Sequence, residues 1–196
     1  MDALILAGGE NKRIPVTKGF LRINGRCIIE TNLELLRGVF DRVMISTNDP
    51  ERYFSLGAPM VGDVVSDRGP MTGIFSTLIA RDCTEVFVTA CDMPFINVIL
   101  IERMVGRWDS RKWDAAVPVF EGKPQPLPGI YSRKIVKKIE ESIQRGRRSL
   151  WDFLREINVH YLSEEEVRSI DREGRSFVNI NTLEDFHREG GTICSA

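Results

Sequence analysis

Short apolar runs alternate with segments of helical spacing along the first half of the chain, and glycine, proline, asparagine or aspartate follows most of these runs. Each run has the length and the bounding residues of a buried strand. Continuous apolar strands that alternate with helices predict a mostly parallel sheet covered on both faces, which is an α/β, Rossmann-like three-layer sandwich. The expected strands are 3–7, 42–47, 58–61 and 85–91, and the expected helices are 27–36, 72–80 and one from Asn97 to about Trp108.

The second half of the chain is less regular and contains a proline-rich stretch at 122–128. Its expected strands are 114–120, 129–131, 159–162 and 177–180, and its expected helices are 133–145, 150–156 and 182–188. No internal repeat, low-complexity tract or long linker interrupts the pattern, so residues 1–196 are expected to form a single domain.

The composition is that of an ordinary globular protein, and it restricts the partners. Of the 196 residues, 42% are hydrophobic and 28% are charged, and the formal net charge of −1 argues against a broad nucleic-acid-binding surface. No apolar stretch approaches the roughly 20 residues of a membrane span, and Asp2 stands where a signal peptide has its basic region. We therefore expect a monomer that binds neither nucleic acid nor membranes.

The cysteines and histidines argue against a zinc site. The four cysteines form no C-x-x-C pair, and only two histidines accompany them. Cysteines used in this way are typical of reduced thiols, and they indicate a cytoplasmic protein.

The loop after the first apolar run is the most informative part of the chain. The run at 3–7 ends in Gly8 and Gly9, and a basic stretch with Arg13 and Lys18 follows. Paired glycines permit positive φ and let a ligand approach main-chain N–H groups, while the cations would meet a polyanion. The loop therefore suggests a nucleoside triphosphate site, although it matches neither the P-loop nor G-x-G-x-x-G. An ordinary turn with a solvated basic loop is the alternative.

Three charged residues could supply the chemistry of such a site. Asp92 directly follows the most apolar run, and Pro94 then turns the chain out of the sheet. A carboxylate at a strand end beside phosphates is a typical Mg²⁺ ligand, and a helix or turn cap is the alternative. Lys18 is a compact charge that suits phosphate oxygens, and Arg13 offers a bidentate fork or a solvent-exposed side chain.

Polar residues after the other strands could contact the rest of a nucleotide, because ligands collect at the carboxyl ends of strands in open α/β sheets. Asn48 is either an Asx-turn residue or a base or ribose contact. Asp63 and Asp67 precede Gly69-Pro70, a tight loop that opens a helix, and either carboxylate could contact the nucleotide or only a turn.

Two features of the second half stay open. Asn179 and Asn181 alternate with aliphatic residues, so their amides would share one face of a strand and either tie loops together or meet a ligand. Arg147 and Arg148 could hold a phosphate of a second substrate or lie exposed to solvent.

These motifs together resemble the molybdenum cofactor guanylyltransferase family. Leu-Ala-Gly-Gly-x-x-x-Arg would fit many nucleotidyltransferases, but Cys-Asp-Met-Pro-Phe and Phe-Val-Asn-Ile-Asn-Thr are specific, and the likeness covers nearly the whole chain in order. The matching stretches are 6–13 with Lys18, 46–48, Asp63, 69–74, 91–95, 124–127, 147–148 and 177–182.

The resemblance implies transfer of GMP from GTP to molybdenum-bound molybdopterin, giving molybdopterin guanine dinucleotide and pyrophosphate. A phosphate oxygen would attack the α-phosphorus in line, without a protein nucleophile and with Mg²⁺ as cofactor. Lys18, Arg13 and Asp92 would be catalytic, with Asp92 as the metal ligand. By resemblance, the GTP site comprises Leu6, Ala7, Gly8, Gly9, Lys18, Asn48, Asp63 and Asp92. Residues of about 1–95 would form the GTP half, and about 96–196 the molybdopterin half.

The chain departs from the family loop at two positions. Pro15 replaces a glycine and fixes φ negative, and Thr17 replaces an aspartate beside Lys18. The alternatives are therefore another guanylyl- or cytidylyltransferase of a phosphorylated small molecule, or a catalytically silent nucleotide-binding relative. Transient contact with cofactor-synthesis or acceptor proteins is also expected.

Overall fold

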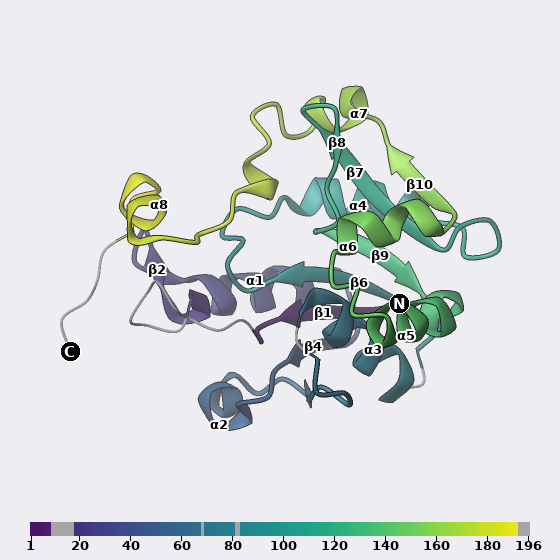
Figure 1. Cartoon of the computed structure of the whole chain (residues 1–196). Coiled ribbons are helices and arrows are strands. Elements are labelled where there is room, and N and C mark those ends of the chain that lie inside the picture. The colour runs from purple at the N-terminus through teal and green to yellow at the C-terminus, as the bar shows by residue number, and fades with distance from the viewer. Residues whose placement is uncertain (9–17, 68, 81–82, 192–196) are drawn as a thin grey trace.

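The structure is a computed structural model that describes residues 1–8, 18–67, 69–80 and 83–191 (Figure 1). The strands of its main sheet are β1 (Asp2–Leu6), β4 (Val43–Ser46), β5 (Met60–Val61), β6 (Glu85–Ala90), β7 (Ala115–Phe120), β8 (Lys123–Pro124), β9 (Gly129–Ser132) and β10 (Val159–Leu162). Within the described ranges they run in the order β10-β7-β9-β6-β1-β4-β5, and β8 pairs with β7. A separate hairpin contains β2 (Arg22–Ile23) and β3 (Arg26–Cys27).

Most strand pairs of the main sheet are parallel. β1 pairs with β4 and β6, β4 pairs with β5, and β10 pairs with β7, all in the parallel sense. The exception in the middle of the sheet is β9, which runs antiparallel to both β6 and β7. Leu4 in β1 lies opposite Met44 on one side and Val88 on the other, and all three are fully buried. Burial of both faces explains the continuous apolar runs in the sequence.

Eight helices and several 3₁₀ turns are present in the described part of the chain. The helices are α1 (Ile28–Arg37), α2 (Pro50–Tyr53), α3 (Pro70–Ala80), α4 (Val98–Arg107), α5 (Val136–Gln144), α6 (Leu150–Phe153), α7 (Glu164–Arg168) and α8 (Leu183–Arg188). The 3₁₀ turns are Lys18–Phe20, Phe54–Leu56, Arg133–Ile135, Leu154–Glu156 and Arg175–Phe177. Asn97 caps α4 as the sequence predicted, because its side chain accepts from the Ile99 amide at 2.9 Å.

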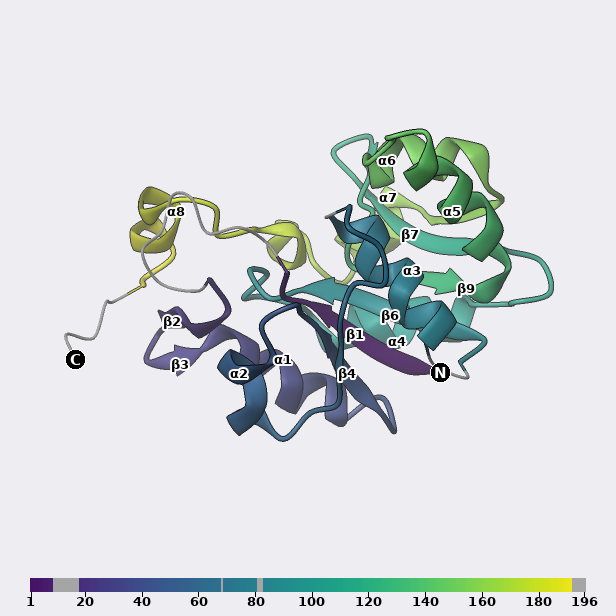
Figure 2. The same cartoon turned by 60° about the horizontal axis from the view of Figure 1, so that its bottom comes forward.

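The helices cover the two faces of the sheet and complete the predicted three-layer sandwich. Ile5 of β1 faces a core built with apolar residues of α1, α4 and α7. Leu4 faces the opposite core, which α3, α5 and α6 close, and Figure 2 shows these three helices over one side of the sheet. Within the described residues, no helix combines the length and apolar character needed to cross a membrane.

A third, smaller cluster lies beyond the edge of the sheet. Figures 1 and 2 both show α8 beside the β2–β3 hairpin. The buried members of this cluster are Leu21, Ile23, Ile28, Ile180 and Phe186.

The prediction of a strand at 177–180 is wrong. A 3₁₀ turn ends at Phe177, and the residues after it use their amides outside any ladder. The Ile180 amide donates to the main-chain oxygen of Asp92 at 2.9 Å, and the Asn181 amide donates to the Asp185 carboxylate at 3.1 Å. Local capping and one long-range bond therefore replace sheet pairing. Asn179 and Asn181 are both exposed rather than a buried row.

Candidate nucleotide and metal site

The chain leaves β1 between two neighbouring strands. The Leu6 carbonyl accepts from the Cys91 amide at 3.0 Å, and the Ala7 amide donates to the Ser46 carbonyl at 2.9 Å. Gly8 follows and is exposed, and a Cβ placed on it would meet no described atom within 4 Å. Gly8 does not have a positive φ, so its conformation is not one that requires glycine, and the main chain lies open at this position.

Tyr53 contacts the chain on both sides of the predicted phosphate loop. Its hydroxyl donates to the Ala7 carbonyl at 3.3 Å, and its ring stacks on Phe20 with centroids 5.3 Å apart. Phe20 ends the 3₁₀ turn that begins at Lys18. Tyr53 is 1% exposed, and burial raises the pKa of its hydroxyl, which therefore stays a donor at neutral pH. Nothing in the local sequence marks this role, because both contacts are long-range.

Gly19 brings two of the predicted charged positions near each other. A Cβ on Gly19 would lie 3.3 Å from the Cys91 Cβ, so the two backbones are closely packed. Lys18 precedes Gly19 and Asp92 follows Cys91, which places both residues at the same carboxyl edge of the sheet. The Cys27 thiol, whose pKa burial raises, donates to the Gly19 carbonyl at 3.3 Å and holds this turn.

Asp92 occupies a half-buried turn directly after β6. Capping of α4 is not its role, because Asn97 is the cap. No three His, Cys, Asp or Glu side chains cluster as metal ligands among the described residues. A Mg²⁺ ion usually takes only one or two carboxylates and completes its shell with water and substrate phosphates. Asp92 therefore fits a metal that binds together with a triphosphate.

The structure joins two of the predicted nucleotide contacts. Asn48 follows β4 and Asp63 follows β5, and the Asn48 amide group donates to the Asp63 carboxylate at 2.6 Å. In return, the Asp63 main-chain amide donates to the Asn48 side-chain oxygen at 2.8 Å. An amide group donates two hydrogens and a carboxylate accepts at two oxygens, so the pair can form further hydrogen bonds besides these two.

Asp67 contacts the second half of the chain instead. Its carboxylate lies 2.7 Å from the Arg148 guanidinium, and Arg147 forms an ion pair with Glu156. Both arginines are thus paired with carboxylates, and Asp67 contacts Arg148 while Asp63 contacts Asn48.

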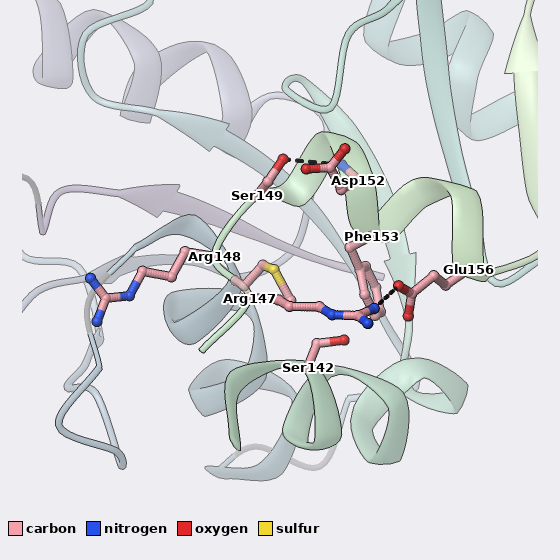
Figure 3. A pocket seen from close by; sticks show the side chains of 8 residues that line it. Ser142, Arg147, Arg148, Ser149, Asp152, Phe153 and Glu156 are labelled. Atoms are coloured by element: carbon pink, nitrogen blue, oxygen red, sulfur yellow. Dashed lines mark hydrogen bonds and ion pairs between the residues drawn. The ribbon is translucent and has the colours of Figure 1, made fainter. Parts of the chain in front are cut away.

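The two arginines also line a cavity of about 350 Å³ between α3, α5 and α6. Figure 3 shows Arg147 crossing this cavity toward Glu156, while Arg148 points away from it. The lining residues are Met71, Ser142, Arg147, Arg148, Ser149, Asp152, Phe153 and Glu156.

Several predicted site residues lie outside the described part of the chain. Gly9 and Arg13 fall there, as do Pro15 and Thr17. For Lys18 only the backbone position is described. The structure therefore places the ends of β1 and β6, the Lys18 turn and the Asn48–Asp63 pair along the carboxyl edge of the sheet, and the function of each residue stays a prediction.

Comparison with known proteins identifies the family. The MobA-like NTP transferase domain matches residues 3–162. A probable molybdenum cofactor guanylyltransferase of Peptoclostridium acidaminophilum is 33% identical over 192 residues, covering 95% of this chain and 87% of that protein. The molybdenum cofactor guanylyltransferase of Syntrophotalea carbinolica is 34% identical over 187 residues, covering 95% of this chain and 89% of that protein.

Solved structures agree with this assignment. The crystal structure of molybdopterin-guanine dinucleotide biosynthesis protein A from Archaeoglobus fulgidus matches with a TM-score of 0.83 and 28% identity, covering 97% of each chain. The 2-C-methyl-D-erythritol 4-phosphate cytidylyltransferase of Thermus thermophilus, at 18% identity and a TM-score of 0.70, shares the fold alone. The chain belongs to the family of MobA-like NTP transferases, and to the molybdenum cofactor guanylyltransferases that its sequence motifs resembled.

Proposed function

We propose that this protein transfers GMP from GTP to molybdenum-bound molybdopterin, forming molybdopterin guanine dinucleotide and pyrophosphate. Relatives named as molybdenum cofactor guanylyltransferases, similar over 95% of the chain, support this assignment. The observation that carries it is the packing of Gly19 on Cys91, because it brings the chain at Lys18 and the chain at Asp92 to the edge where Gly8 lies open.

In this proposal the residues after β1 bind the triphosphate. Main-chain N–H groups from Gly8 and Gly9 would face the phosphates, and Lys18 and Arg13 would neutralise their charge. The Asn48–Asp63 pair, with donors and acceptors on one surface, would bind the base or the ribose.

Asp92 is the residue that would hold Mg²⁺ with the substrate phosphates. The ion, when bound, would supply a Lewis acid that offsets negative charge on the transferred phosphoryl group. Dependence on Mg²⁺ is thus part of the proposal, as is the assignment of Asp92 as its ligand.

The remaining catalytic work would be positioning. A phosphate oxygen of molybdopterin would attack the α-phosphorus while pyrophosphate leaves on the opposite side, so no side chain has to form a covalent bond. Lys18 and Arg13 would stabilise charge on the leaving pyrophosphate. The chain would act as one domain, with GTP held by about residues 1–95 and molybdopterin by about 96–196.

We place the reaction in the cytoplasm, with the protein as a monomer that contacts cofactor-synthesis or acceptor proteins transiently. The three described cysteines, Cys27, Cys83 and Cys91, are buried and form no disulfide within the described residues, which suits a reducing compartment.

The test begins with isothermal titration of the purified chain with GTP, CTP, ATP and UTP, with Mg²⁺ present and then chelated. We expect preferential GTP binding that Mg²⁺ strengthens, and formation of the guanine dinucleotide when molybdenum-bound molybdopterin is added. Tighter CTP binding would indicate a cytidylyltransferase instead. Absence of nucleotide binding would overturn the proposal.

Asp92→Asn tests the metal site within the same assay. Turnover should fall by about 10²-fold or more, because the carboxylate charge would be lost where negative charge gathers. Asp109→Asn is the matched control, since Asp109 precedes β7 and lies at the opposite edge of the sheet. Equal turnover in the two variants would exclude Asp92 from the site.

A further inference from the structure

The C-terminal segment of residues 175–191 contacts the neighbourhoods of both Lys18 and Asp92. It lies beyond residues 3–162, which the family domain matches. In Figures 1 and 2 it crosses from the main body of the molecule to the β2–β3 hairpin, where α8 lies. We call residues 175–191 the C-terminal brace.

One side of the brace holds the turn that carries Asp92. The Ile180 amide donates to the main-chain oxygen of Asp92 at 2.9 Å. Five residues further along the chain, the Asn97 amide donates to the Ser176 hydroxyl oxygen at 3.2 Å. Ile180 and Ser176 are fully buried, so water cannot replace these bonds without local opening.

The side chain of Phe95, which lies between Asp92 and Asn97 in the sequence, also contacts the brace. The Arg175 guanidinium lies over the Phe95 ring, 3.9 Å from its centroid, and forms an ion pair with Glu189 at 2.8 Å. The Asp171 carboxylate accepts from the Arg175 and Ser176 amides at 2.9 and 2.7 Å, which fixes the start of the brace.

The other side of the brace packs on the chain that follows Lys18. Ile180 and Phe186 share a buried cluster with Leu21, Ile23 and Ile28. Three residues after α8, Gly191 forms an antiparallel bridge with Ile23. Ile180 thus takes part in both contacts, since its amide holds Asp92 and its side chain packs near the Lys18 turn.

We infer that the C-terminal brace is a positioning element that sets the place of Asp92 relative to Lys18. The turn at 92–97 needs such support, because Pro94 cannot donate to a ladder and the chain has already left β6. A displacement of about 1 Å in a reacting group can cost about 10²-fold in rate. The effect on catalysis rests on the proposed guanylyltransferase function, whereas the effect on the turn does not.

Two variants loosen the brace at different points. Ser176→Ala removes the acceptor of the Asn97 amide, and Arg175→Met removes the charge over Phe95. The reporter is hydrogen exchange at the Ile180 amide, followed by NMR in the ligand-free protein, because neither variant touches that bond directly. If the brace acts as a unit, each variant should speed exchange at Ile180 by about fivefold, the factor expected for one lost hydrogen bond in an opening equilibrium.

Ile139→Val is the matched control for general destabilisation. Ile139 is fully buried in the core that α3, α5 and α6 close, and this cluster includes no residue of the brace. The control should lower the thermal midpoint as much as the brace variants do. Hydrogen exchange at the Ile180 amide should nevertheless be slower in the control than in the brace variants. If the brace variants speed exchange only at Asn97, or no more than Ile139→Val does, the inference is overturned.

Turnover completes the test with a readout that lost stability alone would not change. At a temperature where all variants are folded, the brace variants should lower kcat several-fold. The KM for GTP should change less than kcat, since the Asn48–Asp63 pair is not touched and only the contacts of Lys18 and Asp92 with the triphosphate are disturbed. An unchanged kcat with faster exchange would refute the positioning role. A wild type that transfers no GMP would refute the proposed function, and exchange at Ile180 would still decide whether the brace holds the Asp92 turn.

Discussion

Replacing Tyr53 with phenylalanine removes one oxygen atom at the start of the predicted phosphate loop. The ring would keep its stacking on Phe20, while the Ala7 carbonyl would lose the hydroxyl that donates to it at 3.3 Å. Ala7 is 8% exposed, so water replaces this donor poorly. A net loss of about 1 kcal/mol is expected for one such hydrogen bond, and the cost approaches about 2 kcal/mol if the carbonyl stays unpaired.

Thermal unfolding gives the assay for Tyr53→Phe. For a chain of this length, about 1 kcal/mol corresponds to a decrease of about 2–4 °C in the midpoint. The matched control is Tyr161→Phe on the edge strand β10, where the side chain is 43% exposed and the change should stay within about 0.5 kcal/mol. A loss equal to that of the control, or no loss at all, would refute the argument that Tyr53 fixes the end of β1.

The stability difference between the wild type and Tyr53→Phe should depend on pH, because the Tyr53 hydroxyl is buried. Burial raises the pKa of Tyr53 above the usual value of about 10, so the unfolded state loses its proton first as the pH rises. The stability that this hydroxyl contributes is fully present at neutral pH and is lost progressively above about pH 10. The difference between the wild type and Tyr53→Phe should therefore be constant at neutral pH and shrink in strong alkali.

Two further predictions concern stability. Gly73→Ala would place a Cβ 2.7 Å from the Leu6 side chain and from the Ser46 hydroxyl, so these side chains or α3 must shift, and urea unfolding should show a loss of about 1–3 kcal/mol. Asp185 caps α8 with Thr182, and hydrogen bonds from Thr182 and Asn181 lower the pKa of Asp185. The ionised Asp185 carboxylate therefore contributes to the free energy of unfolding at neutral pH, and this contribution is lost in acid. The difference in thermal midpoint between the wild type and Asp185→Asn should narrow below about pH 4. A difference that does not change with pH would contradict this account.

Local patterns in the sequence were enough to predict most elements and the edge of the sheet where the candidate residues gather. Continuous apolar runs indicated strands buried on both faces, and the residues that end those runs, Gly8, Asn48, Asp63 and Asp92, gather at the carboxyl edge. Asn97 was predicted as a helix cap because a cap needs only its own side chain and an amide two residues on.

The failed strand at 177–180 shows where such reasoning ends. Alternation of polar and apolar residues is also satisfied by a loop in which Ile180 is buried while Asn179 and Asn181 face solvent. A strand and such a loop differ in the hydrogen-bond partner of each main-chain amide. The partner of the Ile180 amide is the main-chain oxygen of Asp92, far away in the sequence.

The sequence by itself determined the fold class, the family motifs and the chemical types of the candidate site residues, because these depend on local periodicity and residue identity. Only the tertiary structure decided that β9 enters the sheet antiparallel, that Tyr53 contacts both Ala7 and Phe20, and that the C-terminal brace reaches Asp92. Each of these contacts joins residues far apart along the chain. Their free energy comes from packing and hydrogen bonds that exist only once the sheet has formed, so no local pattern records them.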